Sequence, residues 1–212
     1  MDTEVIEKTK EEKEKVKKHK MLLDAHNNNI EISDKNLGDK FEDFEKSKLE
    51  ESKTLLYEVN SKPKRYQRYF RGEIVRVKFG VNVGSEFSGD HFAIVISKND
   101  SVIERCLHVI PLTSKKGDKR ILIDNILYNE EELDKLRVLL NNDDISKDDK
   151  KMIKDIIRYY SIKKNIVSYA NYQHMKTVSK LSVSKSMFPK YDYLPFLICP
   201  LEIMEELDKK II

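Results

Sequence analysis

The sequence predicts an α+β protein in which a small β-rich barrel or sheet follows an N-terminal helical extension. Helix formers without Pro or Gly fill the first 29 residues, short β-branched runs begin after Arg71, and further helical patterns lie within and after those runs. We expect a helical extension over residues 1–64 and a barrel domain over residues 65–212. A helical insert is expected at about residues 124–160.

Two helices are expected in the extension. Interleaved Glu and Lys over residues 1–29 predict a polar helix that stops at three asparagines. A second helix is expected to end at Pro63, because apolar residues before it recur at helical spacing: Leu37, Phe41, Phe44, Leu55, Leu56 and Val59. Solvated helices preceding a domain are the plain interpretation, and a dimerising or partner-binding helix is the alternative.

Four β-branched runs predict the strands of the second part: GEIVRVKF, HFAIVIS, LHVIPLT and KNIVSYANY. In the insert, EEELDKLRVLL and SKDDKKMIKDIIRYY predict two helices, the second capped by Ser146 three residues before Asp149. Its apolar face comprises Met152, Ile153, Ile156, Ile157 and Tyr160. A last helix is expected to begin near Pro200, with Ile203, Met204 and Leu207 facing inward.

Composition places few limits on partners. The net charge of +3 does not by itself indicate a polyanionic partner. Cys106 and Cys199 lie in apolar stretches, which predicts two buried thiols in a reducing compartment rather than a disulfide. Neither a signal peptide nor a stretch of about 20 apolar residues is present, so we expect a cytoplasmic protein without membrane contact.

Polar residues of interest gather in two loops of the β-rich part. In the first loop, Ser85, Glu86 and His91 precede the most hydrophobic strand. In the second, TSKKGDKR (113–120), hydroxyls stand beside basic residues, which suits phosphate binding, although a solvated hairpin tip has the same composition. Between residues 61 and 120 there are thirteen Lys or Arg against six Asp or Glu.

The chain carries no Cys-x-x-Cys or His-Glu-x-x-His motif, and its 5 histidines lack ligand spacing, so neither a metal nor another cofactor is expected. The segment GVNVGSEFSG lacks the ending of a Walker loop, which disfavours nucleotide-driven chemistry. A metal-free ribonuclease fits better, because it needs only a base, an acid and donors to phosphate oxygens.

Each candidate also has a structural interpretation. His91 suits proton transfer but could simply begin a strand, and Thr113 could simply end one. Glu86 could only cap its loop. His108 is expected in the core or on a sheet face and is given no role. The late stretch NYQHMKTVSK contains further polar candidates: Gln173, His174, Lys176 and Thr177.

Four segments, RGEIVRVKFG, GSEFSGDHFAIVISKND, LHVIPLTSKK and HMKTVSKLSV, together resemble the MazF/PemK toxins of bacterial toxin–antitoxin systems. The resemblance covers residues 71 to about 116 and 165 to about 185, with the terminal helix. It implies an SH3-like barrel that forms a homodimer and cuts single-stranded RNA, including mRNA, at short sequences without metal. The products are a cyclic phosphate and a 5′-hydroxyl. It also implies a cognate antitoxin whose tail fills the RNA groove, and contact with operator DNA only through the antitoxin complex.

Carried over by position, the resemblance assigns catalysis to His91 and Thr113. The resemblance assigns RNA binding to Gly84, Ser85, Glu86, Lys176 and Thr177, and the phosphate-binding character of the second loop adds Ser114, Lys115 and Lys116. The chain departs from the family at His91, where arginine is usual, and at Phe92, where proline is usual. Histidine can pass a proton but is charged only part of the time, so we expect Lys115 or Lys116 to supply the missing charge.

Two other functions stay open at this point. One is a noncatalytic RNA- or protein-binding module on the same barrel, and the other is a helical interaction protein whose β-rich part is scaffold. Growth arrest on expression would separate them, because the ribonuclease predicts it most strongly. The resemblance does not cover the first helical pair, which we expect to be dispensable for cleavage but required for partner choice.

Overall fold

The computed structural model describes residues 2–35, 38–61, 65–128, 130–142, 145–184 and 197–211. Its α-helices are α1 (Asp2–Ser33), α2 (Phe44–Ser61), α3 (Glu130–Leu140), α4 (Lys147–Lys163) and α5 (Leu201–Ile211). Its strands are β1 (Ile74–Gly80), β2 (Gly89–Val95), β3 (Cys106–Thr113), β4 (Ile121–Asp124), β5 (Ser168–Ala170) and β6 (Lys176–Ser179). Three single 3₁₀ turns are η1 (Asp39–Phe41), η2 (Tyr172–His174) and η3 (Lys180–Ser182).

The strands form one antiparallel sheet in the order β1-β2-β3-β5-β4, and β6 also pairs with β3. The protein is therefore α+β, as the sequence predicts. Beyond η3, Val183 makes an isolated bridge to Val77 and brings the chain back to β1. Because this return is a single bridge, the ladders among the described residues do not close into a barrel.

Strand β3 is the centre of the sheet, and its pairing with β2 stops before its end. The last β2–β3 pair joins Ala93 to Pro111. From Leu112 onward β3 pairs with β5. Strands β2 and β3 thus separate at the end that carries the candidate loops.

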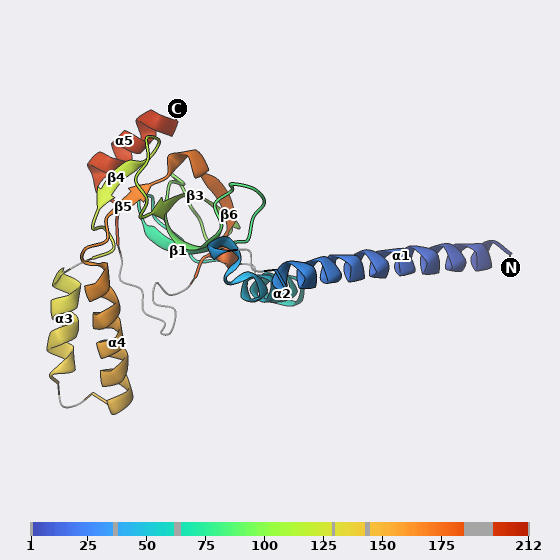
Figure 1. Cartoon of the computed structure of the whole chain (residues 1–212), viewed down its shortest axis with the longest axis horizontal. Coiled ribbons are helices and arrows are strands. Elements are labelled where there is room, and N and C mark those ends of the chain that lie inside the picture. Colours follow the sequence, from blue (N-terminus) through green and yellow to red (C-terminus); the bar gives the residue numbers. More distant parts are fainter. Residues whose placement is uncertain are drawn as a thin grey trace.

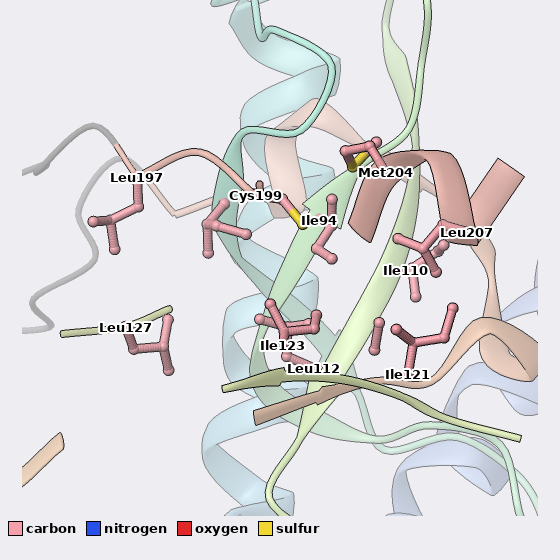
Figure 2. Close-up of a cluster of buried hydrophobic side chains, with 12 residues drawn as sticks. Ile94, Ile110, Leu112, Ile121, Ile123, Leu127, Leu197, Cys199, Met204 and Leu207 are labelled. Carbon is pink, nitrogen blue, oxygen red and sulfur yellow. The ribbon is translucent and has the colours of Figure 1, made fainter. Parts of the chain in front are cut away.

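Two buried clusters lie on opposite faces of the sheet, because alternate strand residues point to opposite faces. Figure 2 shows the cluster that α5 covers, in which Ile94 and Ile110 meet Met204 and Leu207. The other cluster contains Val77, Ala93, Val95, Leu107, Val109 and Val178. The inward-facing residues predicted for the last helix are confirmed, since Met204 and Leu207 are buried and Ile203 packs against the cluster.

The inserted helices α3 and α4 form a hairpin beside the sheet, with a small core of their own (Figure 1). Ser146 caps α4 as predicted, because its hydroxyl accepts a hydrogen bond of 3.1 Å from the Asp149 amide. The predicted apolar face also packs as expected, with Ile153, Ile156 and Tyr160 buried.

Two points predicted from the sequence need correction. Strands β4 and β6 were not predicted, because each is only four residues long and carries a weak strand pattern. Cys106 was expected to be buried but is exposed, because strand alternation places it on a face that no described segment covers there. Cys199 is buried as predicted, and burial raises the pKa of its thiol to about 12.

The two N-terminal helices differ in how they contact the sheet. Helix α1 extends away from the sheet, and all but two of its described side chains from residue 10 onward are exposed (Figure 1). Helix α2 lies against β1: Phe44 is buried, and the Lys78 ammonium is 2.8 Å from a Glu50 carboxylate oxygen. Only α2 and the turn before it are therefore attached to the sheet.

A buried ion pair fastens the start of the β-rich part to the end of β6. The Lys180 ammonium donates to Asp100 Oδ2 at 2.7 Å and to the carbonyl oxygens of Gln67 at 3.0 Å and Ser101 at 2.8 Å. The same carboxylate oxygen accepts from the Tyr69 amide at 2.8 Å. The Lys180 and Asp100 side chains are 1% and 0% exposed, so their charges are compensated inside the protein.

Candidate functional site

The loop between β1 and β2 is held by its own hydrogen bonds. The Asn82 side-chain amide donates to the carbonyl oxygens of Phe79 at 2.9 Å and Phe87 at 2.7 Å. The Asn82 backbone amide donates to the Ser88 hydroxyl, which itself donates to the Glu86 carbonyl. Because both ends of the loop are tied to Asn82, Phe87 has a fixed position above the sheet.

Phe87 is the centre of an aromatic cluster that brings two histidines together. Its ring centroid lies 4.6 Å from that of His91 and 5.9 Å from that of His174. The ring also meets Phe79 edge-on, with centroids 5.3 Å apart. His174 was among the polar candidates of the late stretch, but the sequence gave it no specific role, since its only signal was a histidine in a polar segment.

Gly89 sets the position of the His91 ring. Its backbone φ of +94° is one that residues other than glycine rarely adopt. A Cβ atom at this position would lie 3.2 Å from His91 Nε2. Glycine thus suits the turn, and any Cβ atom here would press on the imidazole unless the ring moved by a few tenths of an ångström.

His91 is half-buried beside Phe87, and burial lowers the pKa of its imidazole. A hydrogen bond to the Ser88 backbone and the Asp90 carboxylate act in the opposite direction, while the Arg76 guanidinium lowers this pKa further. The net effect keeps His91 neutral at pH 7. A neutral imidazole with one nitrogen bonded to the backbone can accept a proton on the other.

His91 and Thr113 lie on the adjoining ends of β2 and β3. The ladder runs from Val95 with Val109 to Ala93 with Pro111 and ends there, two residues short of His91 and Thr113. Thr113 pairs instead with Tyr169 of β5. Both residues share the alternation of the inward-facing Ala93 and Val109, which directs them to the same face of the sheet.

The hydroxyl of Thr113 also has a structural role, as the plain interpretation predicts. Thr113 ends β3, and its Oγ1 accepts a hydrogen bond of 3.2 Å from the Lys115 amide. A hydroxyl that accepts one hydrogen bond still has its own hydrogen to donate. The Arg120 guanidinium bonds the Lys115 carbonyl at 2.6 Å, which folds the basic loop and leaves Ser114, Lys115 and Lys116 exposed.

An ion pair joins the first loop to β6. The Lys176 ammonium lies 3.2 Å from Glu86 Oε2, and both side chains are more than a third exposed. Both residues are thereby brought to the Phe87 cluster, because Glu86 precedes Phe87 and Lys176 follows His174 by two residues. A phosphate that bound Lys176 would have to compete with the Glu86 carboxylate.

Thr177 does not join this group. It is exposed on the face of β6 opposite to Lys176 and Val178, where its hydroxyl lies 3.5 Å from His108 Nδ1. His108 is likewise exposed on a sheet face. A shared RNA contact of Lys176 and Thr177 would therefore have to reach both faces of β6.

The N-terminal extension reaches the same loop. The Lys40 ammonium in η1 donates to the Gly84 carbonyl at 2.6 Å. Gly84 and Ser85 are exposed at the tip, and Gly84 has a positive φ of +59°. The first helical pair is expected to be dispensable for cleavage, but this contact lets η1 help to hold the loop in position.

No group of three or more His, Cys, Asp or Glu side chains among the described residues is placed to hold a metal ion. Among the helices described, none combines the length and apolar character needed to cross a bilayer.

Residues 70–157 match the family model of the PemK-like, MazF-like toxins of type II toxin–antitoxin systems. The match supports a toxin role for this protein. It begins within one residue of the resemblance noted in the sequence and runs on through α3 into α4, which that resemblance left out.

The PemK-like region, residues 70–157, covers less than half of the chain. It contains the first loop, His91, Thr113 and the basic loop, whereas His174 and Lys176 lie beyond it. No curated protein matches the chain.

Proposed function

We propose that this protein is the toxin of a toxin–antitoxin system and acts as a metal-independent, sequence-selective endoribonuclease on single-stranded RNA such as mRNA. PemK/MazF toxins are generally ribonucleases, and the PemK-like region supplies the family context. The observation that supports the proposal is that β2 and β3, whose adjoining ends carry His91 and Thr113, separate after the pair of Ala93 with Pro111.

In the proposed reaction, the 2′-hydroxyl of one nucleotide attacks its own 3′-phosphate. His91, neutral because burial lowers the pKa of its imidazole, accepts the 2′-hydroxyl proton as the O2′–P bond forms. Thr113 donates its hydroxyl hydrogen to a nonbridging oxygen, and Lys115 or Lys116 stabilises the added negative charge. As the P–O5′ bond breaks, a general acid gives a proton to O5′, which leaves a cyclic phosphate and a 5′-hydroxyl.

RNA binding is proposed along the two loops that border these residues. Exposed backbone at Gly84 and Ser85 offers hydrogen bonds to nucleotides, and Ser114 with the two lysines after it faces solvent beside Thr113. Lys176 would take a phosphate in place of Glu86, while Thr177 would contact RNA only from the outer face.

The family also supports a partner, because a type II system pairs each toxin with a protein antitoxin. We propose that the protein is a cytoplasmic homodimer, that an antitoxin segment covers its RNA site, and that it contacts operator DNA only through the antitoxin complex. We further propose an extension over residues 1–64 and an SH3-like barrel domain over 65–212. The bridge from Val183 to Val77 supports the barrel.

The test is incubation of the purified protein with a long unstructured RNA in EDTA, followed by mapping of new 5′-ends. We expect discrete cuts that carry 5′-hydroxyls and that are lost in His91→Ala and Thr113→Ala. His108→Ala is the matched control, because His108 is an exposed histidine on the other face of the sheet. RNA left intact by the parent protein would refute the ribonuclease.

A noncatalytic RNA-binding module is the second candidate. The observation that favours it is the neutral His91 at the position where the family usually has a permanent cation. It predicts RNA that is bound but not cut, and expression that arrests growth only weakly.

A further inference from the structure

We propose that His174 is the second proton-transfer residue of this site and donates a proton to the leaving 5′-oxygen while His91 accepts one from the 2′-hydroxyl. The inference rests on the proposed ribonuclease function and deepens it. Nothing in the PemK-like region points to His174, which lies beyond the residues that match the family model.

Both imidazoles contact the Phe87 ring. His91 and His174 lie 4.6 Å and 5.9 Å from its centroid, so their own separation is at most the sum of these distances. This upper limit is short enough for one phosphodiester to reach both imidazoles with its two ester oxygens. General acid and base catalysts must each reach hydrogen-bond distance of opposite ends of the same phosphate.

His174 is also held firmly in place. It ends η2, and its backbone amide donates to the Asn171 carbonyl at 3.1 Å. Asn171 is buried, and its own amide bonds the Pro111 carbonyl at 3.0 Å, at the last pair of the β2–β3 ladder. The turn that carries His174 is thus fixed to the point beyond which β2 and β3 separate, and its side chain is only partly exposed.

The surrounding charges suit a phosphate between the two rings. Lys176, the first residue of β6, lies two residues after His174. The only described anion bonded to Lys176 is the exposed Glu86 carboxylate. Thr113 ends β3, two residues beyond Pro111, which pairs with Ala93 of the strand that carries His91. A cationic donor and a hydroxyl donor are therefore available to the nonbridging oxygens while the two imidazoles serve the ester oxygens.

The step balances without a co-reactant. The O2′–P bond forms as its proton passes to neutral His91, and the P–O5′ bond breaks as protonated His174 gives its proton to O5′. The enzyme is left with His91 protonated and His174 neutral, and exchange with water restores both. No electron transfer is involved, and the products are those already proposed.

The experiment uses the full-length protein and two matched RNA oligonucleotides, one ordinary and one with sulfur replacing O5′ at the cleaved position. A thiolate leaves without protonation, so the sulfur substrate needs a base but no acid. We expect His174→Ala to cleave the ordinary RNA about 10²–10⁴-fold more slowly than the parent, yet to cleave the sulfur RNA at nearly the parental rate. His91→Ala should be slow on both.

Gln173→Ala, on the same turn, is the matched control and should behave as the parent on both substrates. His174→Gln serves as the second variant if the alanine protein does not fold, which a urea unfolding curve checks. Equal losses on both substrates would reduce His174 to a positioning residue and overturn the proposal, as would full activity of both variants. A parent protein that cuts neither RNA would instead refute the ribonuclease function itself.

Discussion

The buried ion pair of Lys180 and Asp100 allows the sharpest prediction about stability. In Lys180→Met, the Asp100 carboxylate keeps only the Tyr69 amide as a described partner, the Gln67 carbonyl loses the Lys180 donor, and the Ser101 carbonyl keeps the Glu104 amide. Because both side chains are at most 1% exposed, water cannot replace the ammonium without reorganising the structure. An unpaired buried charge costs about 3–5 kcal/mol of unfolding free energy.

For a chain of this size, that loss corresponds to a decrease in melting temperature of about 10 °C. The assay is thermal and urea unfolding of the full-length protein, monitored by the near-ultraviolet circular dichroism of its tyrosines. Lys98→Met is the matched control, since Lys98 is exposed at a neighbouring position, and it should change the free energy by no more than about 0.5 kcal/mol.

The double variant Lys180→Met, Asp100→Asn distinguishes a buried charge from simple loss of packing. Asparagine keeps an acceptor for the Tyr69 amide but carries no charge, so the double variant should be more stable than Lys180→Met alone. A loss below about 1 kcal/mol in Lys180→Met would refute the reasoning, because that is the magnitude of an exposed ion pair.

Four further predictions concern the site. Glu86→Gln releases Lys176 and should tighten binding of an uncleavable 2′-deoxy substrate by up to about fivefold in a titration. Gly89→Ala strains the turn and pushes its methyl group toward His91, so cleavage should fall sharply while RNA binding persists. Because the pKa of His91 is lowered, kcat/KM should begin to fall on acidification only below pH 6.5. The free energy of unfolding should also fall there, because the unfolded state takes up the proton first, and it should fall less in His91→Gln. Removal of α1 should leave cleavage unchanged, whereas Lys40→Ala should weaken it by freeing the loop.

Each of these has a control or a contrary outcome. Glu104→Gln, another exposed carboxylate, should not tighten binding. Val83→Ala, at a side chain that is 86% exposed in the same loop, should cleave as the parent does, unlike Gly89→Ala. If kcat/KM already began to fall above pH 7 on acidification, His91 would be excluded as a base of lowered pKa. Equal activity of Lys40→Ala and the parent would mean that the extension only rests on the loop.

The sequence by itself determined the elements whose signals are local. Helix α3 has the predicted bounds, and α4 has its predicted cap at Ser146, because side chains three or four residues apart decide both features. The strand that begins near His91 and the one that ends at Thr113 were predicted from β-branched runs. These residues also carried the family resemblance that the match to residues 70–157 supports.

Only the tertiary structure decided which residues share a site. His174 meets Phe87 because β5 and β6 both pair with β3 around η2, a contact between positions far apart in the chain that no spacing rule predicts. Strand alternation separates Thr177 from its neighbour Lys176, and an uncovered face leaves Cys106 exposed. Local sequence governs backbone conformation over a few residues, whereas cross-strand register and the packing of η1 on a distant loop depend on the whole folded chain.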